Sequence, residues 1–102
     1  MIHIKAGVCL HHDTVCLPQV WRIIKHAQLL APNNYEITIT SACDGKHHDK
    51  SKHYTGKAID FRTRDFPPRC KVSAWAKRLQ NRLGDEYFVM EETNHLHVQW
   101  NG

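Results

Sequence analysis

The chain has 102 residues and a mass of 11.9 kDa, and 41% of the residues are hydrophobic. It is therefore long enough for one domain with a modest core and too apolar for a disordered chain. No apolar run approaches the roughly 20 residues that span a membrane, so we expect no membrane insertion. The net charge of +4 is spread along the chain, which favours anionic surroundings such as a cell wall and predicts no nucleic-acid partner.

The first two predicted elements are a helix and a strand. Apolar residues at helical spacing predict a helix over residues 18–31, with Pro18 in its first turn and Pro32 as its stop. Strict alternation then predicts a strand over residues 35–40 with one buried face. The following segment, 41–55, is polar and contains three histidines, and a polar loop of this length is typical of a functional segment.

A second strand, helix and hairpin complete the chain. Residues 57–63 predict a strand that carries Asp60 on the face opposite its apolar residues. A second helix is expected to open at Pro67-Pro68 and to end at Gly84. Residues 87–91 and 95–100 predict a hairpin. We therefore expect a single α+β domain over residues 1–102, with a small, mostly antiparallel sheet and flanking helices.

The histidines and cysteines point to a metal rather than to disulfides. Four widely spaced cysteines with no secretion signal are expected to be reduced and mostly buried. Histidine is the commonest metal ligand, and seven of the nine histidines fall in three clusters, 11–12, 47–53 and 95–97. The last two clusters lie near carboxylates in the sequence. We expect no catalytic part for His3, His11, His12, His26 or His47.

The spacing of the last two clusters suggests one hydrolytic zinc site. In a strand, His95 and His97 share a face, while Asp60 points away from the core and follows His53 by seven positions. Such ligands with a spare carboxylate fit a catalytic zinc site. The spare carboxylate depends on the hairpin register. Glu91 shares the histidine face if it lies opposite His97, and Glu92 does so if it lies opposite His95, so both cannot serve.

The pattern Ser51-x-His53-x-x-Gly56-x-Ala58-x-Asp60 resembles the signature of the zinc D-alanyl-D-alanine carboxypeptidases and dipeptidases. Residues 91–97 are similar to the Glu-x-x-x-His-x-His ending of the related hedgehog signalling domain, and residues 44–48 resemble a hedgehog loop. The resemblance covers residues 37–100. It implies a hedgehog/DD-peptidase-like fold, one zinc ion on His53, Asp60 and His97, and Glu91 as general base.

The chain departs from these families at two points. The carboxypeptidases usually carry an arginine after the first strand, where this chain has none, so the substrate's carboxylate must meet another cation: Lys46, Arg62 or Arg64. The acidic cluster that binds calcium in hedgehog is not evident, so zinc is the expected metal.

The resemblance implies a monomeric zinc metallopeptidase that cuts peptidoglycan stem peptides, as a carboxypeptidase or an endopeptidase. Zinc-bound water would attack the carbonyl, Glu91 would carry the proton, and His95 or His48 would stabilise the oxyanion. With no signal peptide, we expect synthesis in the cytoplasm and action at the cell wall after release, by phage lysis or from a virion. The rivals are a non-catalytic zinc-binding domain of the same fold and a basic nucleic-acid-binding or nuclease domain.

Overall fold

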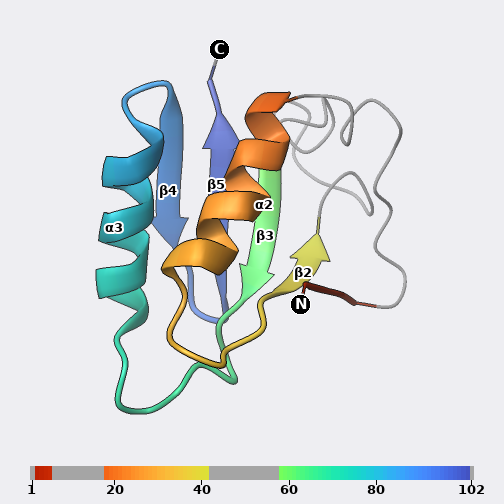
Figure 1. Cartoon of the computed structure of the whole chain (residues 1–102), viewed down its shortest axis with the longest axis vertical. Helices are drawn as coiled ribbons and strands as arrows, with labels where there is room; N and C mark the ends of the chain where they lie inside the picture. The colour runs from red at the N-terminus through yellow and green to blue at the C-terminus, as the bar shows by residue number, and fades with distance from the viewer. Residues whose placement is uncertain (1, 6–17, 42–57, 102) are drawn as a thin grey trace.

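The computed structural model describes residues 2–5, 18–41 and 58–101. Figure 1 shows the arrangement of the helices and strands in these ranges. In chain order they are β1 (His3–Ile4), α2 (Pro18–Leu30), β2 (Thr38–Ser41), β3 (Ala58–Arg62), α3 (Val72–Leu83), β4 (Tyr87–Glu91) and β5 (His95–Trp100).

The strands form one mixed sheet in the order β1-β2-β3-β5-β4. β1 runs parallel to β2, whereas β2–β3, β3–β5 and β4–β5 are antiparallel pairs. The α+β class and the mostly antiparallel sheet are therefore confirmed for the described part of the chain. β3 and β5, which carry Asp60 and the histidine pair, lie side by side with a further strand on each flank.

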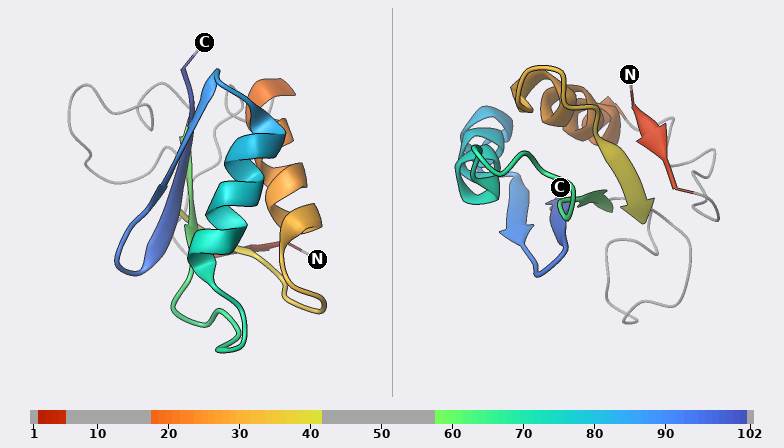
Figure 2. Two further views of the ribbon diagram at one scale, coloured as in Figure 1. Left: turned by 90° about the vertical axis from the view of Figure 1, so that its left-hand side faces the viewer. Right: turned by 90° about the horizontal axis from the view of Figure 1, so that it is seen from below.

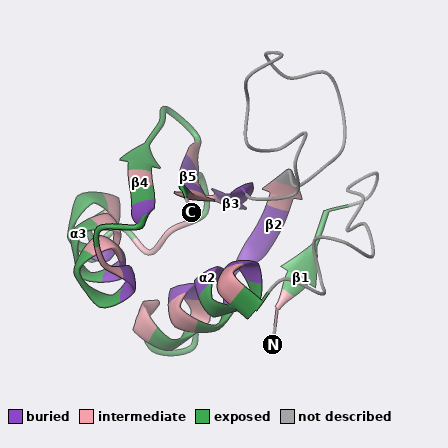
Figure 3. Ribbon diagram, turned by 90° about the horizontal axis from the view of Figure 1, so that it is seen from above, coloured by how far each residue is buried: buried purple, intermediate pink, exposed green. Residues whose placement is uncertain are grey.

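Both helices pack against the same face of the sheet (Figure 2). The core lies between these two layers, and Figure 3 marks buried residues in both of them. Its fully buried members include Ile23, Phe61, Leu79, Leu96 and Val98. Because one sheet face is occupied by this core, the polar residues that alternate with it along β3 and β5 are directed to the opposite face.

The helix bounds agree with the sequence except at the start of α3. α2 ends at Leu30, one residue before the predicted end. α3 begins at Val72 rather than at Pro67, because residues 67–70 form a turn in which the Cys70 N–H donates to the Pro67 carbonyl at 2.9 Å. A residue that precedes a proline disfavours helical angles, and Pro67 precedes another proline. Gly84 ends the helix as predicted, with a φ of 95° that favours glycine.

The strand bounds differ mainly at the N-terminal side of the sheet. β4 and β5 have the predicted bounds, and β3 ends at Arg62, one residue before its predicted end, while its predicted first residue, Lys57, lies outside the described ranges. β2 begins at Thr38 instead of residue 35, because the Gln28 side chain holds the preceding segment: it donates to the Tyr35 carbonyl at 2.8 Å and accepts from the Ile37 N–H at 3.1 Å. β1 was not predicted, since two residues are too few for a periodicity.

The structure bears on two further expectations, one for the cysteines and one for membrane-spanning segments. Cys70 is a free, exposed thiol, so the expectation of mostly buried cysteines fails for this residue, and the other three cysteines lie outside the described ranges. Within those ranges, no helix is long and apolar enough to cross a membrane.

Trp75 joins the two helices through its indole. The ring is 3% exposed, and its Nε1–H donates to the Ala27 carbonyl of α2 at 3.1 Å. Replacing Trp75 by phenylalanine leaves that carbonyl without its partner, so we expect the free energy of unfolding to fall by about 1–3 kcal/mol. Trp21→Phe is the matched control, because Trp21 is 47% exposed, and it should change the value by less than about 0.5 kcal/mol. Urea denaturation measures both; equal losses would contradict the role of this bond.

Candidate metal centre

The polar face of the sheet carries two cross-strand pairs at its centre. Asp60 on β3 lies directly opposite His97 on β5, and Arg62 lies opposite His95. Directly opposite residues share a face, so all four side chains lie on the side of the sheet away from the helices. The buried neighbours Phe61 and Leu96 hold the two strands in this register.

Asp60 and His97 make the closest contact of this group. Oδ1 of Asp60 lies 2.8 Å from Nδ1 of His97, and both side chains are largely shielded from water, at 11% and 17% exposed. Asp60 and His97 are 37 positions apart in the sequence, and the pairing of β3 with β5 brings them together. The structure thus unites two of the three residues that the sequence assigned to zinc.

Gln99 contacts the second ring nitrogen of His97. The Gln99 amide Nε2 donates to Oδ1 of Asn101 at 2.7 Å, which turns its oxygen toward the imidazole. Nε2 of His97 lies 2.7 Å from that oxygen, and the role of each ring nitrogen depends on the tautomer. In the tautomer that donates from Nε2, Nδ1 presents a lone pair to the carboxylate of Asp60, and a proton or a metal ion between these two atoms would be favourable.

The pKa of His97 reflects the same geometry. Burial lowers this pKa, but the hydrogen bonds to Asp60 and Gln99, together with the negative charges of Asp60 and Glu92, outweigh burial and raise it above its ordinary value. A histidine whose surroundings favour a positive charge at Nδ1 is also suited to a metal cation at that atom, with Gln99 holding the other nitrogen, as is usual for metal-bound histidines.

His95 lies at the edge of this centre. Its Nε2 is 3.8 Å from Oδ2 of Asp60, beyond hydrogen-bond distance, and its Nδ1 is 2.9 Å from Oδ1 of Asn94. The side chain is 32% exposed, more open to solvent than that of His97. His95 is therefore placed to meet a molecule that approaches Asp60 from solvent.

The hairpin register distinguishes the two candidate carboxylates. Met90 pairs with His97 and Glu91 with Leu96, and the Glu92 N–H donates to the His95 carbonyl at 2.9 Å. Glu92 consequently shares the face of the histidines, whereas Glu91 shares the face of Leu96. The influence of Glu92 on the pKa of His97 agrees with this placement. The condition under which Glu91 would face the metal, a position opposite His97, is not met.

A cationic hollow of about 260 Å³ opens beside Asp60 and His95. Its remaining lining is polar or basic: Lys5, Thr40, Arg62, Arg64 and Asn94. Arg62 and Arg64 are two of the three cations that the sequence suggested for a substrate's carboxylate. Lys5 was missed, because it directly follows the unpredicted edge strand β1, whose pairing with β2 carries it to the hollow. The arrangement suits an anionic group bound next to the Asp60 carboxylate.

The opposite flank of the centre is apolar. Met90 lies across from His97 and Phe88 across from Gln99, and these side chains are 40% and 39% exposed. Large apolar side chains on a polar face mark a contact surface for an apolar group. The centre therefore has a cationic side toward β2 and an apolar side along β4.

Several predicted site residues fall outside the described part of the chain: His53, the third proposed ligand; His48, the proposed oxyanion partner; and Lys46. Within residues 2–5, 18–41 and 58–101, no three histidine, cysteine or acidic side chains gather closely enough to hold a metal. The Asp60–His97 pair fits zinc by the chemistry of its donors, and a third ligand would come from another segment, as the sequence assigns to His53.

Comparison with known proteins gives no family assignment. No protein-family model matches the chain, and no curated protein matches it significantly.

Proposed function

We propose that the chain is a zinc metallopeptidase domain that hydrolyses peptide bonds in peptidoglycan stem peptides. The observation that carries this proposal is the contact of Asp60 with His97 at 2.8 Å, which sets a carboxylate and an imidazole, two donors that bind zinc, beside each other on one sheet face. The likeness of residues 51–60 to the zinc carboxypeptidase signature supplies His53 as the third ligand and a hedgehog/DD-peptidase-like fold.

The proposed ligands are His53, Asp60 and His97. Two neutral imidazoles and one carboxylate leave an open position, and zinc held this way supplies a water molecule with a pKa near 7, according to the usual behaviour of such sites. A closed structural site would need four protein ligands, so a spare acid nearby favours catalysis over a purely structural role.

Glu92 is the proposed general base in place of Glu91. The register that sets Glu92 across from His95 supports this change, because the base must share the face of the ligands. Glu92 would accept the proton of the attacking water and pass it to the leaving amine. His95, at the open edge of the centre, would donate to the developing oxyanion, a role often worth about 3 kcal/mol. His48 remains a second candidate for that role.

The two flanks of the centre suggest how a stem peptide would lie. The hollow with Lys5, Arg62 and Arg64 suits the peptide's carboxylate, and the exposed Met90 suits an alanine methyl group on the other side. A free carboxylate bound beside the reacting bond favours cleavage near the end of the stem. We propose that the protein acts as a monomer at the cell wall after release from the cytoplasm, in phage lysis or from a virion.

The direct test is zinc-dependent release of peptides from purified peptidoglycan. Chelator-treated protein is expected to release none, and one equivalent of zinc should restore release. Mass spectrometry of the fragments identifies the bond, and native mass spectrometry counts one zinc per chain independently of activity. Zinc binding without any released peptide would favour a non-catalytic zinc domain. Salt-sensitive cleavage of DNA or RNA without peptide release would favour the nuclease alternative.

A further inference from the structure

The helical layer carries a marked excess of positive charge. Residues 18–34 and 66–84, which contain α2 and α3 with their flanking turns, hold half of the 14 lysines and arginines and no aspartate or glutamate. These seven cations are exposed in the structure: Arg22, Lys25, Arg69, Lys71, Lys77, Arg78 and Arg82. Because both helices cover the face of the sheet opposite Asp60 and His97, this surface is separate from the candidate metal centre (Figure 2).

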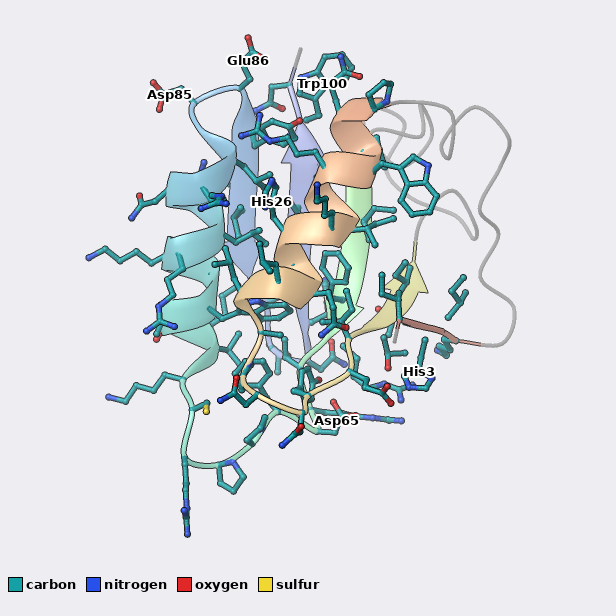
Figure 4. The ribbon with its side chains drawn as sticks, in the orientation of Figure 1. His3, His26, Asp65, Asp85, Glu86 and Trp100 are labelled. Carbon is teal, nitrogen blue, oxygen red and sulfur yellow. The ribbon has the colours of Figure 1, made fainter. Side chains whose placement is uncertain are left out.

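The cations are not neutralised by acidic neighbours. None of the seven forms an ion pair with a carboxylate in the part of the chain that the structure describes. The acids nearest in sequence to residues 66–84 are Asp65 on one side and Asp85 and Glu86 on the other, and Figure 4 shows them at opposite ends of the molecule. The charge is therefore available to an external anion.

The charges line up along α3 and continue onto α2. Lys71, Arg78 and Arg82 follow one another at seven and four residues, which places them on one stripe about 16 Å long. At one end, a hollow of about 400 Å³ is bordered by Arg69, Lys71 and Arg78. At the other end, Arg22 of α2 donates to the Arg82 carbonyl at 2.9 Å, so the two helices present their cations together.

His26 reports the strength of this positive field. It lies on the side of α2 that faces α3 (Figure 4), and it is partly buried. Burial lowers the pKa of His26, and the positive charges of Arg82, Arg22 and Lys25 lower it further. A bound anion would offset these charges and raise the pKa. The sequence suggested an ordinary surface histidine here, because the contact between the helices is not visible in the sequence.

We propose that this helical surface, with the stripe Lys71, Arg78 and Arg82 at its centre, binds a flexible phosphodiester polymer of the cell wall. Four of the seven cations are arginines, whose planar guanidinium groups match phosphate oxygens in pairs. Trp75 of α3 is buried, and the exposed Trp21 of α2 lies five residues before His26, about 140° around the helix from the side that faces α3, so the stripe itself has no platform on which nucleic-acid bases would stack. The choice of a wall polymer rests on the proposed function; the binding itself does not.

Binding of the helical surface to the polymer would keep the protein near its substrate. Contacts made by charge alone bind weakly and release counterions, so the protein could move along the polymer while the opposite face meets stem peptides. Retention of this kind would raise hydrolysis of intact wall without changing hydrolysis of a soluble peptide.

The test measures binding of a fluorescent glycerol-phosphate oligomer to the full chain without zinc, as a function of salt. We expect Arg78→Gln combined with Arg82→Gln to weaken binding about tenfold or more and to reduce the slope of log K against log salt by about 1.4, at about 0.7 for each charge removed. Arg78→Lys combined with Arg82→Lys keeps both positive charges at the same positions and should change binding less than about threefold, with the salt slope retained. Circular dichroism confirms that both variants are folded, and the His26 pKa, followed by NMR, should rise on binding.

Three results would overturn the inference: no binding by the wild type, equal weakening in both double variants, or tighter binding of single-stranded DNA with the same number of phosphates. Hydrolysis of a soluble stem peptide is assayed separately with zinc. Arg78→Gln with Arg82→Gln should leave it unchanged while slowing release from intact wall. Oligomer binding that persists in a chain without peptidase activity would refute the proposed function and leave the surface assignment standing.

Discussion

Asp60→Asn is expected to abolish zinc binding and hydrolysis together. Asp60 supplies a negative charge in contact with His97, at 2.8 Å, and asparagine keeps the shape of the side chain while removing that charge. Loss of a residue that merely supports a metal ligand usually costs 10- to 100-fold in affinity or activity, so loss of a ligand should cost more than about 100-fold in both. Asparagine at this position also presents no carboxylate oxygen to the ion.

Zinc affinity is measured by competition with a chelating dye, and hydrolysis by release of fragments from peptidoglycan. Asp85→Asn is the matched control, because Asp85 is an exposed aspartate in the turn between α3 and β4 (Figure 4) and should leave both values unchanged. Thermal melts of the metal-free proteins show whether the Asp60 variant is folded. A folded Asp60→Asn protein that binds zinc as tightly as the wild type would remove Asp60 from the ligand set.

Glu92→Gln is expected to lower hydrolysis by about 10²- to 10⁴-fold with zinc binding retained, because glutamine cannot accept the proton of the attacking water. Glu91→Gln carries the same change on the neighbouring residue, whose strand position lies opposite Leu96 on the other face of the sheet. It should keep hydrolysis within about threefold of the wild type. The two carboxylates are both exposed, so neither substitution should disturb the core.

The comparison of these two variants separates three readings of the site. Loss of activity in Glu92→Gln alone supports Glu92 as the base. Loss in Glu91→Gln alone would restore the assignment implied by the resemblance to hedgehog and the zinc carboxypeptidases. A wild-type protein that binds zinc but is inactive on every stem peptide would instead indicate a binding domain. Zinc content is measured for each protein, so a catalytic loss is not confused with a loss of metal.

Local patterns in the sequence were sufficient for most helix and strand bounds. α2, β4 and β5 lie within one residue of their predicted ranges, because apolar spacing, Pro32 and Gly84 act on nearby backbone. Prediction failed at the starts of two elements. The Gln28 side chain, from α2, delays the start of β2, and a local turn at residues 67–70 delays the start of α3.

The sequence by itself determined that His95, His97 and Gln99 share one face of a strand and that Asp60 points away from the core, because alternation is a property of the strand alone. Only the tertiary structure decided that β3 lies beside β5 and that Asp60 meets His97 across them, 37 positions apart. It also decided the hairpin register that turns Glu92, rather than Glu91, to the histidine face. Strand neighbours and register depend on the packing of the whole core, whose contacts join residues far apart in the chain.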